Sequence, residues 1–129
     1  MPRLLNWLLL PTLALAIACG DNGGGADEMV PDSDLPCSSV SAEEIWESTP
    51  AAISDACLWF DFRAQTTYEF EHPLGREPRI ILGYISFAED GTSSTIASGD
   101  VFLILDATDA TVTIRNGQNQ DFFLRLVLQ

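Results

Sequence analysis

The hydrophobic pattern of the chain changes twice along its length. Residues 3–19 are mostly apolar, residues 20–57 are polar and acidic, and from residue 58 short apolar runs alternate with turn residues. Seven of these runs are rich in aliphatic, β-branched and aromatic residues and predict strands at 58–62, 66–70, 80–87, 92–97, 101–105, 111–115 and 122–128. Tight-turn pairs such as Asp90-Gly91 and Asn116-Gly117 separate them. No long helical pattern intervenes, so we expect an all-β fold, a small antiparallel β-sandwich of about seven short strands.

The last predicted strand is apolar on both of its faces. In residues 122–128 only Arg125 interrupts the second alternating set of apolar side chains. A second apolar face needs a cover, and two covers fit the sequence. One is the segment 37–57, with Ile45, Trp46 and Ile53 lying over the sheet, and the other is a second copy of the chain. We favour the segment 37–57.

The beginning of the domain has a different local pattern. Ser41-Ala42-Glu43-Glu44 has the form of a helix capping box, in which the serine accepts from first-turn amides and the glutamate reaches back. Pro50 would end such a helix within a few residues. The single domain, residues 37–129, is therefore expected to open with a short helical or irregular segment before its strands.

The N-terminal apolar run has the features of an export signal. Arg3 precedes the stretch 4–17, which is shorter than the roughly 20 residues that a membrane-spanning helix needs. The sequence Ala16-Ile17-Ala18-Cys19 resembles the lipobox of bacterial lipoproteins. This resemblance implies a signal peptide of residues 1–18 and a lipid on the Cys19 thiol. Ala16 and Ala18 also suit an ordinary signal peptidase, which would leave an unmodified cysteine.

Lipidation sets the expected location of the protein and of its next residues. The lipidated cysteine and the acidic, Gly-rich residues that follow, 19–36 in all, would form a flexible tether on the membrane. The predicted location is the bacterial cell envelope. Gly20, rather than Asp, follows the cysteine, and by resemblance to lipoprotein sorting this favours the outer membrane.

Three cysteines are present, which leaves an odd thiol for an exported protein. If a lipid occupies Cys19, Cys37 and Cys57 remain to form a disulfide. The closed loop of about 20 residues would stabilise the fold by roughly 3 kcal/mol in the chain-entropy treatment.

The charge of the chain excludes one large class of partners. Removal of residues 1–18 takes away one basic residue and no acidic one, which changes the formal net charge from −13 to −14. Nucleic-acid binding needs a track of Lys and Arg, so we exclude it. The acidic pairs Asp32-Ser33-Asp34 and 106–109 lack the ligand spacing and glycine of an EF-hand loop. We expect no metal site and no cofactor.

A short motif lies between two of the predicted strands. Residues 66–78 run from a strand into a His-x-Leu-Gly-Arg-x-Pro turn, and this arrangement resembles a small β-rich domain of tailed-phage virion proteins over residues 66–129. The resemblance implies a β-sandwich used for assembly or surface recognition. Within the turn, Gly75 can take positive φ and Pro78 keeps the preceding residue extended. The residues that make up the motif are His72, Leu74, Gly75, Arg76 and Pro78.

No motif for catalysis is present. His72 is the sole histidine, and beside a turn it is expected to bond a main-chain carbonyl; there is also no Gly-x-Ser-x-Gly elbow. We therefore expect no catalytic residues and a role in binding or assembly, as a homo-oligomer or with an envelope protein. A monomeric glycan-binding module that uses Trp46 and Tyr68 is one alternative. An envelope hydrolase with a carboxylate pair is another, because the separation of such a pair is a three-dimensional quantity.

Overall fold

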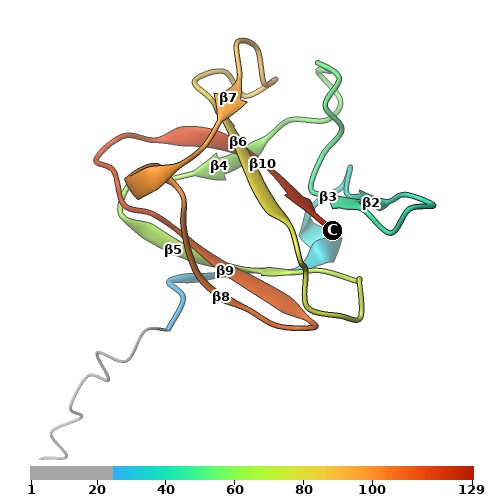
Figure 1. The fold of residues 1–129 in the computed structure, drawn as a ribbon. Helices are drawn as coiled ribbons and strands as arrows, with labels where there is room; N and C mark the ends of the chain where they lie inside the picture. The colour runs from blue at the N-terminus through green and yellow to red at the C-terminus, as the bar shows by residue number, and fades with distance from the viewer. Residues whose placement is uncertain (1–24) are drawn as a thin grey trace, which may run out of the picture.

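The computed structural model describes residues 25–129, which fold into two packed β-sheets (Figure 1). Within this range there is no α-helix, and none of the helical turns is long or apolar enough to cross a membrane. The elements are β1 (Glu28–Val30), a 3-10 turn η1 (Asp32–Asp34), β2 (Ser39–Val40), β3 (Trp46–Glu47), β4 (Phe60–Phe62), β5 (Thr66–Glu71), β6 (Ile81–Ser86), β7 (Thr95–Ile96), a 3-10 turn η2 (Gly99–Val101), β8 (Leu103–Ala107), β9 (Thr111–Asn116) and β10 (Phe122–Leu128). The prediction of an all-β sandwich is confirmed.

The two sheets have different connectivities. The smaller sheet has the order β1-β5-β9-β8, in which only the β1–β5 pair is parallel. The larger sheet has the order β2-β3-β10-β6-β7, and β4 also pairs with β10. Because β6 occupies one edge of β10 along most of its length, β3 and β4 share the other edge, β3 near the end of β10 and β4 near its beginning.

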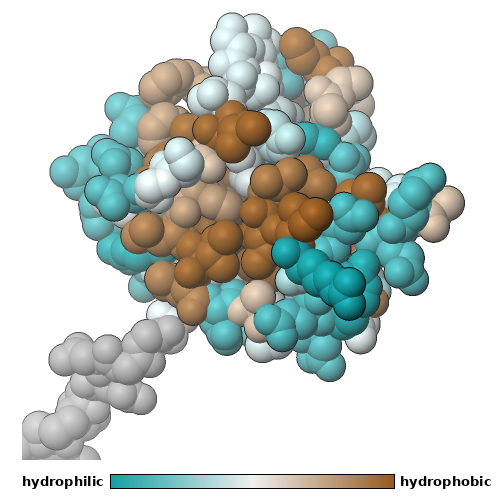
Figure 2. Space-filling model, viewed as in Figure 1, coloured by the Kyte–Doolittle hydropathy of each residue, from teal (hydrophilic) through white to brown (hydrophobic). Residues whose placement is uncertain are grey.

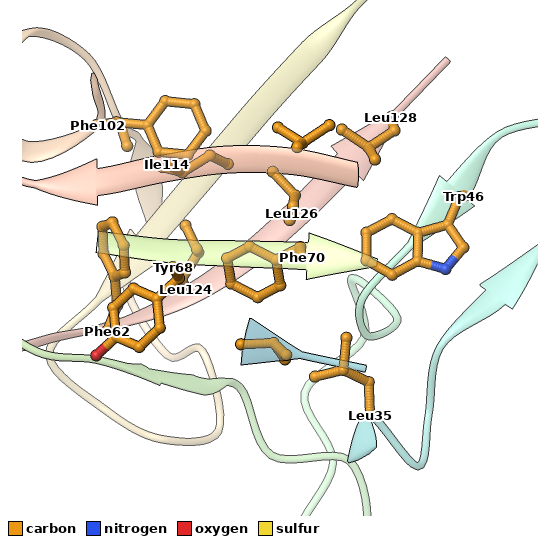
Figure 3. Packing of buried hydrophobic residues seen from close by; sticks show 13 residues of the cluster. Leu35, Trp46, Phe62, Tyr68, Phe70, Phe102, Ile114, Leu124, Leu126 and Leu128 are labelled. Carbon is orange, nitrogen blue, oxygen red and sulfur yellow. The ribbon is translucent and has the colours of Figure 1, made fainter. Parts of the chain in front are cut away.

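The core lies between the inner faces of the two sheets (Figure 3). Tyr68 and Phe70 enter it from β5, and the alternate residues Leu124, Leu126 and Leu128 enter it from β10. All five side chains are fully buried, as the two-residue period of a strand predicts for one face. Phe60 packs edge to face against both Tyr68 and Phe70, a favoured arrangement for such rings.

All seven predicted strands have counterparts in the structure. The last one, 122–128, has the predicted bounds, whereas the strand predicted at 101–105 begins at Leu103 because η2 occupies residues 99–101. The strands β1, β2 and β3 were not predicted. Each is two or three residues long, which is too short to show a period of two.

The predicted flexible tether, residues 19–36, is wrong for its second half. Glu28–Val30 forms β1 and pairs in parallel with β5, where Val30 lies beside Phe70. Val30 and Leu35 are both buried in the core. The edge of β5 offers unpaired main-chain groups, and Val30 gains burial there, so this stretch is ordered despite its acidic composition. Cys19 and the predicted signal peptide, 1–18, lie outside the described residues.

The predicted helix start at Ser41 is also wrong. Residues 41–45 form the turn of a hairpin between β2 and β3, closed by a hydrogen bond from Ser41 N–H to the carbonyl of Ile45 at 2.8 Å. Ser41 Oγ accepts from Ile45 N–H, and Glu44 has a φ of +59°. A left-handed residue at that position is incompatible with a helix, and burial of Trp46 against β10 favours the hairpin.

Candidate functional site

The outer face of the larger sheet carries apolar side chains around one arginine. Because the even-numbered residues of β10 point into the core, its odd-numbered residues point outward. The cross-strand register places Arg125 beside Tyr84, Tyr84 beside Ile96, and Val127 beside Leu82. We call this surface the outer face, and define it as Leu82, Tyr84, Ile96, Phe123, Arg125 and Val127. Ile96 is 60% exposed and Leu82 is 37% exposed.

Arg125 is held rigidly in the middle of the outer face. Its side chain is 9% exposed, its Nε donates to the carbonyl of Thr49 at 3.0 Å, and Nη2 donates to the carboxylate of Glu47. The guanidinium also lies over the ring of Tyr84, 5.1 Å from its centre. The charge of Arg125 is therefore matched by Glu47, and the one exposed carboxylate that the register places on this face is Asp61, beside Phe123 at the start of β10. In the sequence, Arg125 stands out as the one charged residue in the otherwise apolar strand 122–128.

The segment 37–57 meets the outer face at Arg125, through Glu47 and Thr49, and not through Trp46 and Ile53 as expected. Trp46 lies in the core, fully buried, with its indole N–H donating to Asp32 at 3.0 Å. The hairpin of β2 and β3 extends the sheet at its edge instead of lying over it. Ile53 is 62% exposed. The favoured cover is therefore wrong, because Trp46 gains more burial inside the sandwich than above it.

The edge strand β8 adds exposed apolar side chains on a neighbouring side of the molecule. Ile104 and Leu105 are both about half exposed, and β8 is the last strand of the smaller sheet. The register shifts between Ile104 and Asp106, which marks a β-bulge. Figure 2 shows apolar side chains gathered in the middle of the view, where β6 and β8 lie in Figure 1. A β-bulge and a charged residue, here Asp106, discourage another strand from pairing with an edge strand. This surface is therefore better suited to contacts through side chains than to main-chain pairing.

The predicted turn motif has a structural role, because the His72 side chain holds the turn in place. His72 is buried, and its Nε2 lies 3.1 Å from the carbonyl of Thr108, while Leu74 N–H donates to Nδ1. With Nδ1 accepting, Nε2 carries the proton and donates to that carbonyl. Gly75 has a φ of +69°, which glycine adopts without strain. Nε2 of His72 therefore fastens the turn to the β8–β9 connection, and Nδ1 stabilises the turn itself.

The remaining motif residues are not brought together with His72. Leu74 packs against the core, and Pro78 is buried. Arg76 lies 3.8 Å from Glu44, and it lines a surface hollow of about 440 Å³ together with Glu43, Glu44 and Arg79. Two cations and two anions balance there, so the hollow has no net preference for a charged ligand.

The two aromatic residues predicted to contact a ligand cannot do so. Trp46 and Tyr68 are fully buried in the core. Tyr68 uses its hydroxyl oxygen to accept from Arg63, whose Nη2 also donates to Glu28. These two contacts, the Tyr68 hydrogen bond first, raise the pKa of the Arg63 guanidinium above its ordinary value. Glycan binding through Trp46 and Tyr68 is therefore contradicted by their burial.

The predicted disulfide is present. Cys37 and Cys57 are joined, with their Cα atoms 5.7 Å apart. Among residues 25–129, no group of three or more His, Cys, Asp or Glu side chains is placed to hold a metal ion.

Asp90 shows a lowered pKa, because Thr92 donates to its carboxylate from both the hydroxyl and the main chain.

No protein-family model, curated protein or solved structure matches the chain in comparisons with known proteins. The fold defines a small all-β sandwich, and strand register gathers apolar side chains with Tyr84 and Arg125 on the outer face. Apolar side chains around a fixed Arg and Tyr are the composition found at the centres of protein–protein interfaces.

Proposed function

We propose that the protein is a lipid-anchored component of the bacterial cell envelope, attached through Cys19, whose non-catalytic β-sandwich assembles with further copies through the outer face. The observation that carries this proposal is the cluster of Leu82, Ile96 and Val127 around the buried Arg125. Arg and Tyr are enriched at interface centres, where they are surrounded by apolar contacts that exclude water. Within residues 25–129, Glu47 and Thr49 contact Arg125, while Leu82 and Ile96 remain exposed.

The distribution of charge supports assembly through this face. The mature chain has a formal charge of −14, which opposes close approach of two copies. On the outer face, however, Arg125 is neutralised by Glu47. At physiological salt the screening length is about 8 Å, so carboxylates away from the face repel only weakly. We therefore expect assembly to strengthen as the salt concentration rises from low values.

The anchor would keep the sandwich close to the membrane. Eight residues, 20–27, separate Cys19 from the start of β1. Eight extended residues span at most about 28 Å. A short tether of this kind places several domains on one membrane near each other and raises their effective concentration. This favours lateral assembly of copies on the same surface.

The direct test is the solution mass of residues 19–129 carrying Cys19→Ser, by light scattering after size exclusion with the disulfide intact. We expect a closed oligomer. Leu82→Asp with Ile96→Asp should give a monomer, because four charges would be buried in a two-fold contact. The matched control, Val40→Asp with Ile53→Asp, places the same charges on exposed aliphatics elsewhere and should leave the mass unchanged. A parent protein that stays monomeric at every concentration and salt would contradict the proposed assembly.

The anchor is tested separately by mass spectrometry of the N-terminal peptide from membrane fractions. A diacylglycerol-modified Cys19 is the expected result. An unmodified cysteine, or an N-terminus elsewhere, would contradict the lipid anchor without affecting the assembly experiment.

A further inference from the structure

A groove of about 390 Å³ lies beside β4, between the chain segments that precede β3 and β4 in the larger sheet. Ser48, which follows β3, closes the edge of β10 next to it: its N–H donates to the carbonyl of Leu126 at 2.9 Å, and its Oγ accepts from Leu126 N–H at 2.8 Å. Two chain segments form the walls: 34–37 after η1, and 55–58 before β4. The Cys37–Cys57 disulfide joins these walls and fixes their spacing.

The groove combines an apolar lining with a negative rim. Leu58, Trp59 and Phe60 contribute apolar surface, and Leu58 is 48% exposed. Asp34, Asp55 and Asp61 also line the groove, and all three are exposed. The ion pairs found within residues 25–129 use other carboxylates, and no basic residue lines the groove. Its negative charge is therefore not compensated by the protein.

We propose that this groove binds a Lys or Arg side chain of a basic peptide segment from a partner protein. The alkyl stem of such a side chain can lie on Leu58 and the aromatic residues, while its cationic end reaches the carboxylates. The charge of −14 on the mature chain attracts a basic segment from a distance and raises its association rate. The volume of the groove suits one such side chain with part of its main chain.

The apolar lining favours a peptide over a simple polyamine. Leu58, Trp59 and Phe60 line the groove beside the aspartates. Side chains that flank a basic residue in a peptide can pack on these residues, whereas a polyamine carries no side chains.

Fluorescence anisotropy with a labelled probe tests this inference on residues 19–129 carrying Cys19→Ser, which contain the whole core and the disulfide. The probe is fluorescein-Ala-Leu-Arg-Leu-Arg-Ala-amide, and the same peptide with Gln for Arg is the reference. Asp34→Asn with Asp55→Asn should weaken binding about tenfold, the loss of roughly one charge-assisted contact. Glu71→Gln with Asp109→Asn changes the net charge equally at exposed sites elsewhere and should change the affinity less than about twofold.

Two further measurements locate the peptide. Leu58→Ser keeps the charge and should lower the affinity several-fold, since it removes apolar surface from the groove. The indole N–H signal of Trp59 should shift in NMR spectra on binding, while that of the fully buried Trp46 should not. Melting curves of each variant verify that it is folded.

Equal loss of affinity in the groove variant and its charge-matched control would overturn the assignment, since general attraction by an acidic chain would then suffice. Equal binding of the Gln peptide, or of spermidine at the same concentration, would overturn it as well. The inference does not rest on assembly: Leu82→Asp with Ile96→Asp should bind the Arg peptide as the parent does. The two proposals can therefore fail independently.

Discussion

Replacing Arg125 by Met tests whether its guanidinium fastens the chain around Thr49 to the larger sheet. Methionine retains a long apolar stem, so the substitution mainly removes the hydrogen-bond donors. The donors lost are those to the carbonyl of Thr49 and to the carboxylate of Glu47. Glu47 is also held by the pairing of β3 with β2 and β10, whereas Thr49 lies beyond these pairs, so loss of the donor should loosen the chain around Thr49.

The expected cost follows from the surroundings of each acceptor. A buried carbonyl that loses its donor costs about 1–3 kcal/mol, and Thr49 is buried. The side chain of Glu47 is 31% exposed, so water solvates it in the variant and its loss of the ion pair adds at most about 1 kcal/mol. Loss of the contact with the Tyr84 ring adds about 0.5–1 kcal/mol. Burial of the charged guanidinium costs desolvation energy in the parent protein, and the methionine variant no longer has this cost, which offsets part of the loss. We expect the free energy of unfolding to fall by about 2–3 kcal/mol in total.

Urea unfolding at neutral pH and fixed protein concentration, followed by tryptophan fluorescence, measures this loss. Arg115→Met is the matched control. Arg115 is less buried and its donors go to side chains, Thr67 Oγ1 and Gln65 Oε1, so we expect a loss below about 1 kcal/mol there. Adding Glu47→Gln to Arg125→Met should recover part of the stability, because no unpaired carboxylate then remains. A loss below about 0.5 kcal/mol for Arg125→Met, with an unchanged denaturant slope, would refute the argument.

Three further predictions concern other parts of the fold. Gly83→Ala should cost about 1–3 kcal/mol in urea unfolding, since the new Cβ would lie 2.5 Å from a ring carbon of Phe102; an unchanged midpoint would contradict that contact. Reduction of the disulfide, whose cysteines are 20 residues apart, should lower the free energy of unfolding by about 3 kcal/mol and lower the melting temperature. A melting temperature that is the same with and without dithiothreitol would contradict this prediction. NMR titration should place the pKa of Asp90 below its ordinary value, and Thr92→Ala should return it toward that value. Because the folded pKa is depressed, the associated stability is present above the unfolded pKa and is lost as the pH falls through the folded pKa.

The strands were predictable wherever they were long enough to show alternation. In β10 the sequence pattern identified both bounds, and the single Arg125 in its outer set indicated an unusual environment. The disulfide was predictable from the number of cysteines and the expected loss of one to the lipid. These features depend on local composition or on counting, which a sequence contains directly.

The short strands and the direction of Trp46 were not predictable in this way. A two-residue strand has no measurable period, and the capping-box pattern at Ser41 indicated a helix. Pairing of β3 with β10 decides the outcome, since it buries Trp46 completely and orders the hairpin. Similarly, β1 is an acidic stretch whose order comes from pairing with β5. Tertiary contacts overrode local propensity at both places.

By itself, the sequence determined the alternating apolar strands, the excess of carboxylates, the N-terminal signal pattern and the pairing of two cysteines. Only the tertiary structure decided which face of β10 enters the core, which carboxylate neutralises Arg125, and that three uncompensated aspartates share one groove. The physical reason is the range of the interactions. Alternation is a property of neighbouring residues, whereas Glu47 and Arg125 are 78 residues apart and meet only because chain folding places β3 beside β10.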